Sequence, residues 1–398
     1  MKEIKYMLVG EVCSTISDTY RGKADLVTLV NTSDVLEGKV LNHERVQNAN
    51  LKGQFKKAFR QDDILYSEIR PQNKRYAYVD FSPEDYIAST KLMVIRAKAE
   101  VVSPKYLYYF LKNEPTVAEL QMLAESRSGT FPQITFTEVA NLMIPILSLD
   151  IQEVIVKTLQ CIEDKIGCNN RINDNLQAQA QALYKAWFVD FAPFDYLKPS
   201  DWRQGTVSDL AAEIVCGKTP STKNKEYYGD DVPFITIPDM HGVVYSLKTE
   251  RALSLLGAQS QAKKTLPSNS VAVSCIGTAG LVTLIPVPSQ TNQQINSIIP
   301  KDGVSPFYIY LLMQTMAETI NKLGQSGSTI VNLNKTHFGK MSVLIPSISD
   351  MKDFDDIVAP IFEVILFNQK ENLKLAELRD ELLPKLMSGE IDVSAVQL

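Results

Sequence analysis

The sequence predicts an α+β fold in which two α/β domains are separated by two long antiparallel coiled-coil helices, with a pseudo-twofold internal repeat. Three observations predict this fold. Motifs of the first half of the chain return in the second half at an offset of about 200 residues. Each half ends in an apolar heptad pattern, which predicts a long coiled-coil helix. The rest of each half mixes short β-branched runs with turn residues, a pattern typical of strands.

The internal repeat covers both ends of each domain. Val102–Tyr109 (VSPKYLYY) returns as Val304–Leu311 (VSPFYIYL), and Val9–Val12 resembles Val207–Leu210. Two shorter repeats are Ser128-Gly129-Thr130 with Ser326-Gly327-Ser328, and Ile144-Pro145 with Ile345-Pro346. A period this long indicates duplicated domains and not a solenoid, whose units are much shorter.

The repeat and the heptads divide the chain into four parts. We expect a first domain over residues 1–147 and a central long helix with its joint over 148–199. A second domain over 200–347 and a C-terminal long helix over 348–398 complete the chain. Two domains of about 150 residues each are of ordinary size for globular units.

Composition favours a globular protein of the cytoplasm. Hydrophobic residues make up 45% and charged residues 22% of the 398 positions. No apolar run is long enough for a transmembrane helix, and the polar start Met1–Lys5 does not resemble a signal peptide. The five cysteines are scattered, which argues against a disulfide framework. The net charge of −5 predicts that any surface for nucleic acid is local or is supplied by a partner.

Several short runs within the two domains read as strands, and two stretches read as helices. The expected strands are Leu26–Val30, Ile64–Ile69, Leu92–Ile95, Phe234–Ile237, Val271–Ile276 and Leu281–Val287. The expected helices are Pro104–Lys112 and Pro306–Lys322. Each domain therefore combines a sheet with helices.

The long helices should pair through their apolar seams. The pairing residues of the first helix are Ile155, Ile162, Asn169, Asn173, Leu176 and Leu183; those of the second are Ile361, Ile365, Asn368, Asn372, Leu375 and Leu382. Each helix is expected to span roughly 37 residues, or about 55 Å. Asp150 and Ser349 or Asp350 are candidate N-caps, and Gly389 is a candidate helix stop.

Asparagines interrupt both seams near the middle of the helices. If the helices pair antiparallel, the asparagines of one fall opposite those of the other. Buried seam asparagines lower stability but fix the register of a coiled coil. The alternative is that these polar positions mark a solvated stretch, and their recurrence in both copies favours the register interpretation.

Ordered motifs across both halves point to one family. The second half carries Gly217–Ser221, Tyr227–Gly229, Val232–Ile235, Asp239-Met240, Val271–Thr278 and Thr291–Asn296; the first half carries the looser Leu29–Gly38, Asp63–Pro71 and Ala88–Thr90. Together with the C-terminal Arg379–Ile391, these resemble the target-recognition domains and C-terminus of type I restriction–modification specificity subunits. Tyr184–Phe188 departs from that family's Leu-Leu-Pro-Lys-Leu pattern, so the resemblance of the first helix rests on its heptads.

The resemblance implies a role in DNA recognition. Each domain would be a target-recognition domain that reads one half of an asymmetric, two-part target in double-stranded DNA, and the helices would set the unread gap. The helices would also dock two adenine-methyltransferase subunits, with restriction and translocase subunits further out. By the same resemblance, this chain binds no cofactor, and S-adenosylmethionine, ATP and Mg²⁺ belong to the partner subunits.

Candidate DNA contacts are basic residues for phosphates and amide or arginine side chains for base edges. The candidates of the first domain are Lys57, Arg60, Arg70, Gln72, Asn73, Lys74, Arg75, Ser128 and Thr130. Those of the second domain are Lys218, Thr219, Lys223, Lys225, Thr278, Gln293, Gln294, Ser326 and Ser328, with Lys263 and Lys264 as a further basic pair. For each residue the alternative is a solvated surface or a loop side chain that bonds its own backbone.

Other chemistries find little support in the sequence. Gly217-Lys218-Thr219 fits a relaxed phosphate-loop pattern, but Pro220 and the residues after it predict a loop where that mechanism needs a helix. His43, His241 and His337 lie far apart without paired cysteines, so no metal site is predicted. We find no catalytic set, and therefore expect a non-catalytic subunit. The alternative is a coiled-coil-braced protein–protein scaffold without DNA specificity, which the acidic charge would favour.

Overall fold

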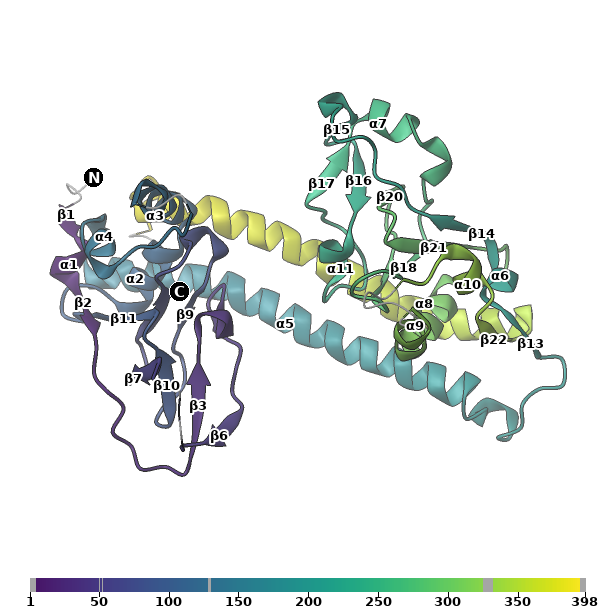
Figure 1. Cartoon of the computed structure of the whole chain (residues 1–398), viewed down its shortest axis with the longest axis horizontal. Helices are drawn as coiled ribbons and strands as arrows, with labels where there is room; N and C mark the ends of the chain where they lie inside the picture. The colour runs from purple at the N-terminus through teal and green to yellow at the C-terminus, as the bar shows by residue number, and fades with distance from the viewer. Residues whose placement is uncertain (1–4, 50, 52, 128–129, 325–331, 394–398) are drawn as a thin grey trace. The chain divides into compact units, whose positions relative to one another are not determined.

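The chain folds into two compact units in the computed structural model, which describes residues 5–49, 51, 53–127, 130–324 and 332–393 (Figure 1). Unit 1 comprises Met1–Lys165 and Lys374–Leu398, and unit 2 comprises Ile166–Leu373. Both long helices run through both units, so the unit borders fall inside helices. The four-part division at residues 147, 199 and 347 separates domains from helices and stays a prediction.

Unit 1 is built on two four-stranded sheets. Its strands are β1 (Lys5–Leu8), β2 (Cys13–Ile16), β3 (Leu26–Val30), β4 (Val35–Leu36), β5 (Lys39–Val40), β6 (Arg45–Gln47), β7 (Phe55–Lys57), β8 (Ile64–Ser67), β9 (Tyr76–Tyr78), β10 (Tyr86–Ser89), β11 (Leu92–Ala97) and β12 (Met143–Ile146). Its shorter helices are α1 (Val9–Val12), η1 (Thr32–Asp34), η2 (Pro71–Asn73), α2 (Pro104–Lys112), α3 (Glu114–Arg127) and α4 (Phe136–Ala140). The sheets have the orders β2-β11-β8-β9 and β6-β3-β10-β7, and β1 pairs with β12.

Unit 2 repeats this plan. Its strands are β13 (Arg203–Thr206), β14 (Ala211–Cys216), β15 (Tyr228–Gly229), β16 (Val232–Ile235), β17 (Arg251–Leu253), β18 (Val271–Ser274), β19 (Val282–Leu284), β20 (Gln290–Thr291), β21 (Ile295–Pro300) and β22 (Ser342–Ile345). Its shorter helices are η3 (Ala192–Phe194), α6 (Val207–Leu210), η4 (Lys225–Tyr227), η5 (Ile237–Met240), α7 (Leu255–Gln259), η6 (Ala262–Lys264), α8 (Pro306–Thr315), α9 (Ala317–Gly324) and α10 (Lys335–Gly339). The sheet orders are β14-β21-β18-β19 and β15-β17-β16-β20, and β13 pairs with β22.

The repeat predicted from sequence is therefore a repeat of topology. In each unit one sheet holds a parallel pair, β3 with β10 in unit 1 and β16 with β20 in unit 2. Within each unit the strand that follows this pair, β11 or β21, enters the other sheet. Local backbone contacts recur as well, since Ile69 bridges Gln133 and Ile276 bridges Asn332 in the same antiparallel sense. The α+β fold and its duplication are confirmed.

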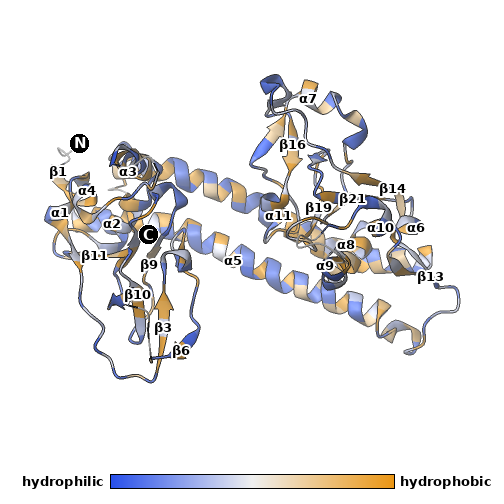
Figure 2. Ribbon diagram, in the orientation of Figure 1, coloured by the Kyte–Doolittle hydropathy of each residue, from blue (hydrophilic) through white to orange (hydrophobic). Residues whose placement is uncertain are grey.

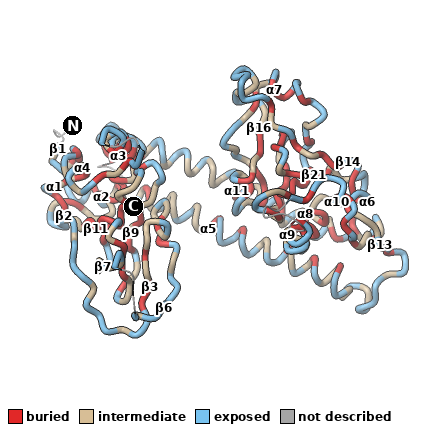
Figure 3. The backbone as a smooth tube through the Cα atoms, in the orientation of Figure 1, coloured by how far each residue is buried: buried red, intermediate tan, exposed pale blue. Residues whose placement is uncertain are grey.

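Each unit has its own apolar core, and Figure 3 shows the central strands of both as largely buried. In unit 1, Tyr106 and Tyr109 of α2 are fully buried, and Tyr106 donates a hydrogen bond to the Pro145 carbonyl. In unit 2, Tyr308 of α8 is equally buried and donates to the Leu344 carbonyl. The tyrosines of the repeated motif thus fill the core and pair their hydroxyls, which removes the cost of burying them.

Two helices of 40 residues each follow the domains: α5 (Leu149–Phe188) and α11 (Ile348–Met387). Apolar and polar residues alternate along both of them (Figure 2). Both begin before the predicted N-caps, since Asp150 and Asp350 lie in their first turns. At α11 the Asp350 amide donates to the Ser347 hydroxyl, so Ser347 caps this helix. Gly389 follows the end of α11 with φ +69°, a conformation that glycine adopts without strain.

The helices run antiparallel where they pair within unit 2. Asn169 donates to Asn372, and four residues further along α5 Asn173 accepts from Asn368, four residues earlier in α11. Trp187 stacks edge-on against Phe354 still further along. In unit 1, Ile155 and Leu159 of α5 share a core with Leu383 and Leu386 of α11. The prediction that the two long helices pair antiparallel is confirmed.

Three of the four seam asparagines are buried, and all four bond to another asparagine. Asn169 and Asn173 are 0% and 5% exposed, and Asn368 is 6% exposed. Asn169 also donates to Glu371, and Asn372 donates to Asn170. The polar positions thus form a layer of two hydrogen-bonded pairs inside the helix pair, Asn169 with Asn372 and Asn173 with Asn368. The alternative of a solvated stretch does not describe Asn169, Asn173 or Asn368.

Candidate nucleic-acid interface

Two loops meet at one side of unit 1, and we call them edge 1 (residues 69–75 and 130–133). The Ile69–Gln133 bridge and a hydrogen bond from the Arg70 amide to the Pro132 carbonyl (3.2 Å) join them. Arg70 and Lys74, on either side of η2, have φ values of +44° and +54°. These positive values make the loop turn sharply around Pro71. Edge 1 is therefore a tightly folded loop backed by a second segment.

Four predicted contacts are exposed at edge 1: Arg70, Gln72, Asn73 and Thr130. The side chains of Arg70, Gln72 and Asn73 make no hydrogen bond or ion pair with any part of the chain that the structure describes. The backbone beneath them is fixed, because the Gln72 amide donates to the buried Gln121 side chain (3.2 Å). These groups can therefore point at a ligand without first breaking a bond of the fold.

Three other predicted cations of unit 1, Lys57, Arg75 and Lys74, bind groups within the protein. The Lys57 ammonium donates to the carbonyls of Thr90 and Leu92 (3.1 and 2.8 Å), and burial lowers its pKa. Arg75 donates to the carbonyls of Ser33 and Val35. Their heads hold neighbouring backbone, which favours the structural alternative for both. Arg60 is exposed, and its amide donates to Asp63 (2.8 Å).

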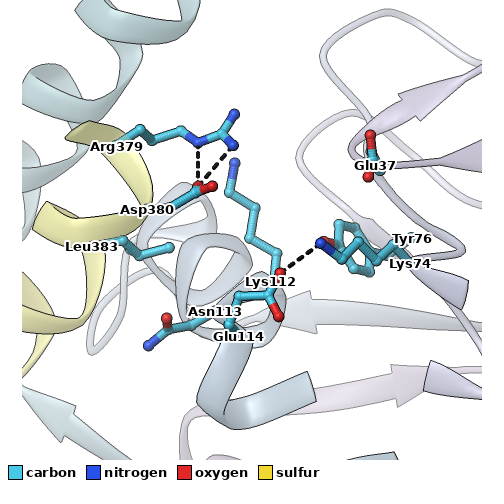
Figure 4. A pocket seen from close by; sticks show the side chains of 9 residues that line it. All are labelled: Glu37, Lys74, Tyr76, Lys112, Asn113, Glu114, Arg379, Asp380 and Leu383. Atoms are coloured by element: carbon cyan, nitrogen blue, oxygen red, sulfur yellow. Dashed lines mark hydrogen bonds and ion pairs between the residues drawn. The ribbon is translucent and has the colours of Figure 1, made fainter. Parts of the chain in front are cut away.

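Lys74, the third of these cations, faces a charged cavity of about 120 Å³ (Figure 4). Its ammonium lies 2.5 Å from the Glu114 carboxylate. The other lining residues are Glu37, Tyr76, Lys112, Asn113, Arg379, Asp380 and Leu383. Burial lowers the pKa of Lys112, although an ion pair with Glu163 opposes this shift. Acidic and basic groups balance in this cavity, where the end of α11 meets the loops of unit 1.

A hollow of about 400 Å³ beside edge 1 holds residues that the sequence analysis missed. Its lining includes Lys91, Arg127, Phe131 and Gln133. Lys91 donates to Gln133 and Glu68 (both 3.3 Å), and Arg127 pairs with Glu138 (2.7 Å). Extending the aligned Ala88–Thr90 and Thr291–Gln293 motifs by one residue would have found Lys91 opposite Gln294.

Three segments meet at the corresponding side of unit 2, and we call them edge 2 (residues 217–219, 276–278 and 292–294). The Lys218 amide donates to the Thr291 carbonyl, and the Cys275 amide donates to the Gln294 carbonyl. A Cβ at Gly217 would lie 2.1 Å from the Asn292 carbonyl oxygen, so only glycine lets these segments approach so closely. Edge 2 lies where the chain passes from β20 in one sheet to β21 in the other sheet.

The structure gathers five predicted contacts at edge 2. The Thr219 hydroxyl donates to the Gln293 side-chain carbonyl (2.7 Å), and Gln293 is exposed. The Gln294 side-chain carbonyl accepts from Asn292 (2.9 Å), which directs that side chain along the backbone. Lys218 and Thr278 are exposed beside them. Residues separated by up to 76 positions in the sequence, from Lys218 to Gln294, thus share one surface.

The remaining predicted residues of unit 2 divide between edge 2, its surroundings and the parts not described. Gln261, two residues before Lys263, donates to the Lys218 carbonyl (2.7 Å), which brings Lys263 and Lys264 to the neighbourhood of edge 2. Lys223 is exposed on the loop before η4, and Lys225 is exposed as the first residue of η4. Ser128, Ser326 and Ser328 lie outside the described residues.

Groups for catalysis or metal binding do not converge at either edge. Among the described residues, no group of three or more His, Cys, Asp and Glu side chains could hold a metal ion. Gly217-Lys218-Thr219 is followed by a loop and not by a helix, as predicted, so it is no phosphate-binding loop. Burial raises the pKa of the Cys275 thiol to about 12, which leaves it protonated at neutral pH. None of the helices described in the structure is both long and apolar enough to cross a bilayer.

Comparison with known proteins links both halves of the chain to one family. The family model for the type I restriction modification DNA specificity domain matches twice, at residues 1–178 and 199–376. The type I restriction enzyme HindI specificity subunit of Haemophilus influenzae is 39% identical, over 98% of this chain and all of the relative. The MjaIX specificity subunit of Methanocaldococcus jannaschii is 29% identical over 49% of the chain and 46% of its own length.

A solved structure agrees at the level of the fold. The type I restriction–modification S subunit of M. genitalium has a TM-score of 0.56 at 13% identity, covering 97% of this chain and 96% of its own. Its likeness concerns the fold alone, whereas the family model and the H. influenzae relative rest on sequence over most of the chain. On these grounds the chain belongs to the type I restriction–modification DNA specificity family.

Proposed function

We propose that this chain is the DNA specificity subunit of a type I restriction–modification complex, in which each unit reads one half of a two-part DNA target. The observation that carries the proposal is the twofold match to the DNA specificity domain. Edges 1 and 2 supply exposed arginine and amide side chains, which are the groups that read base edges in the major groove. The scaffold alternative has no comparable support from the relatives.

The two half-sites should differ in sequence. Arg70, Gln72 and Asn73 stand at edge 1, whereas Thr278, Gln293 and Gln294 stand at edge 2. Different donors and acceptors select different base pairs. An asymmetric target follows from this difference.

The helices α5 and α11 would set the unread gap between the half-sites. At 1.5 Å per residue, a helix of 40 residues is about 60 Å long, longer than one turn of DNA. The asparagine layer supports this role because a slip of the helix pair by one turn would separate Asn173 from Asn368. A fixed register would keep the gap constant.

The same helices would dock two adenine-methyltransferase subunits, with the restriction and translocase subunits further out. Ile357, Val364 and Phe367 form an apolar stripe on one face of α11, and Phe367 is 64% exposed. A stripe of this kind is typical of a surface that a partner covers. We also propose that the chain is non-catalytic and that S-adenosylmethionine, ATP and Mg²⁺ are bound by the partners. The net charge of −5 fits a complex in which partners add to the basic surface facing DNA.

Modified-base sequencing of DNA from cells that co-express this chain with its methyltransferase tests the proposal. A split, asymmetric methyladenine motif that depends on this chain is the expected result. Replacing residues 1–147 by the matching domain of a relative should change one half of that motif and keep the other. Methylation that is unchanged without this chain would overturn the proposal.

The spacer and docking roles have separate tests. Removing one matched heptad from each helix should shorten the unread gap, and an unchanged gap in an active variant would overturn the spacer role. Phe367→Asp should reduce co-purification of the methyltransferase. Val287→Asp, at a residue that is 46% exposed on unit 2 outside the helices, serves as the control and should leave co-purification unchanged.

A further inference from the structure

Edge 2 rests on a pair of buried glutamines. Gln261 and Gln290 are 7% and 0% exposed. The Gln261 side chain donates to the side-chain carbonyl of Gln290 (2.8 Å) and to the backbone carbonyl of Lys218 (2.7 Å). Gln290 in turn donates to the Ala258 carbonyl (3.0 Å) and to the Thr265 hydroxyl (2.9 Å). Both side-chain amides therefore direct their donors at fixed groups of the protein.

The position of Gln290 holds an apolar residue, Ile87, in unit 1. The parallel strands β3 and β10 place Ile87 opposite Leu29, whereas β16 and β20 place Gln290 opposite Phe234. Burying an amide is costly unless its hydrogen bonds are made, so an apolar residue as in unit 1 would satisfy packing alone. The hydrogen bonds of the two glutamines in unit 2 therefore serve more than packing. Gln290 accepts from Gln261, and Gln261 holds the Lys218 backbone.

By holding the Lys218 backbone, Gln261 also fixes the next residue, Thr219, which contacts the exposed side-chain amide of Gln293. Thr219 follows Lys218, and its hydroxyl donates to the Gln293 side-chain carbonyl. A carbonyl oxygen has two lone pairs, so Gln293 can accept one more hydrogen bond. Its NH₂ group makes no bond to any part of the chain that the structure describes. The outward side of Gln293 thus offers one acceptor beside donors, in an orientation that Thr219 sets.

An acceptor next to a donor on a glutamine matches the major-groove edge of adenine, which offers a donor at N6 and an acceptor at N7. We propose that Gln293 reads one adenine of the half-site recognised by unit 2, and that Thr219, held in place by the Gln261–Gln290 pair, is its positioning residue. This inference rests on the proposed function. It assigns a base class to a single side chain, which the family membership does not.

The first step of the test is to read the target of the wild-type complex by modified-base sequencing. The complex of the full chain with its methyltransferase then methylates a library in which each position of that target is randomised. Gln293→Ala should lower discrimination at a single A·T pair of one half-site by about tenfold or more, because a bidentate contact is lost. All positions of the other half-site should keep their preferences.

Thr219→Val separates positioning from contact. This variant removes the hydroxyl but keeps the shape, so it should lower discrimination at the same base pair by a smaller factor than Gln293→Ala. Thr219→Ser keeps a hydroxyl and should restore wild-type discrimination. Gln261→Met removes the donors to Lys218 and should affect the same base pair. Gln204→Ala, at an exposed glutamine of β13 in the same unit, is the control and should change no position.

Three outcomes overturn this inference. One is an unchanged preference at every position in Gln293→Ala, and another is a change at a pair without adenine. The third is a Thr219→Val variant that lowers the melting temperature and weakens all positions equally, because that pattern describes a purely structural threonine. A wild-type complex without any sequence preference would instead overturn the proposed function, so the two failures are distinguishable.

Discussion

Unit 1 and unit 2 hold the same junction between their two sheets by different means. In unit 1 the Lys57 ammonium donates to the carbonyls of Thr90 and Leu92, just where the chain passes from β10 to β11. In unit 2 the chain passes from β20 to β21 at Gln293, and the Thr219 hydroxyl donates a hydrogen bond to the side-chain carbonyl of Gln293. The backbone plan is kept by strand pairing and core packing, so the side chains at the junction are free to differ. Duplication of the fold thus allows each copy its own recognition chemistry.

A second difference lies at the start of the central strands. Asp63, just before β8, is fully buried and accepts both hydrogen bonds of the Arg96 guanidinium (2.7 Å each). At the matching positions of unit 2 stand Ser270, before β18, and Ile299 of β21. Unit 1 therefore has an ion pair with a fully buried carboxylate where unit 2 has a serine that donates to the Pro267 carbonyl.

Breaking the ion pair gives the largest expected effect. Asp63→Ala leaves the Arg96 guanidinium without its carboxylate and should destabilise unit 1 by about 3 kcal/mol. Ser270→Ala should cost unit 2 about 1 kcal/mol or less. Both tryptophans, Trp187 and Trp202, lie in unit 2. Far-ultraviolet circular dichroism should therefore show an earlier transition for Asp63→Ala while tryptophan fluorescence keeps its midpoint.

The control for this prediction is built into the two probes. An equal shift of both transitions would show that the units unfold as one cooperative body, and the comparison would fail. An absence of any shift would show that the ion pair does not stabilise unit 1.

Removing one member of the asparagine layer comes next in size. Asn173→Ala leaves the buried Asn368 amide without its acceptor and should cost about 2 kcal/mol, measured by chemical unfolding followed by tryptophan fluorescence. Asn173→Leu combined with Asn368→Leu should recover most of this loss, since neither polar group then remains unpaired. A double variant as unstable as the single one would contradict the pairing.

Two glycines of unit 2 test close packing against open space. A Cβ at Gly217 would lie 2.1 Å from the Asn292 carbonyl oxygen, whereas one at Gly167 in α5 meets nothing within 4 Å. Gly167→Ala should therefore raise stability by about 1 kcal/mol, the helix preference of alanine over glycine. Gly217→Ala should instead lower the melting temperature of unit 2 and weaken methylation of its half-site. Equal effects of the two changes would refute the close approach at edge 2.

The smallest expected effect concerns pH. Hydrogen bonds from the Thr206 amide and hydroxyl lower the pKa of Asp209, whose carboxylate completes the capping box of α6 with the N-cap Thr206. A carboxyl with a lower pKa in the folded state contributes stability above its unfolded pKa and loses it as the pH falls through the folded pKa. Asp209→Asn should therefore flatten the acid limb of the stability curve of unit 2, measured by fluorescence melting between pH 2 and 5 (about the range of carboxyl titration).

Asp230→Asn, at an exposed aspartate of the same unit, is the matched control. It should leave the acid limb as steep as in the wild type. If both variants flatten the limb equally, the cap at α6 is not the cause of the acid sensitivity.

Local patterns predicted several elements closely. Leu26–Val30 and Pro104–Lys112 match β3 and α2 at both ends, because a short β-branched run and an N-terminal proline mark them in the sequence. The predicted helix Pro306–Lys322 is instead two helices that break at Met316. No proline or glycine announces that break. The repeat does, since α2 and α3 are separated in the same way at Asn113.

The sequence by itself determined the duplication, the two long helices and the asparagine layer, because each depends on residues at short, regular spacing or on direct self-similarity. The tertiary structure decided which polar side chains of the domains are available. Lys57 and Arg75 read like phosphate contacts but bind backbone carbonyls, while Gln261 and Gln290 escaped notice and meet across 29 residues. Such contacts join segments that are distant in the chain, and their hydrogen bonds form only when the sheets bring the segments together.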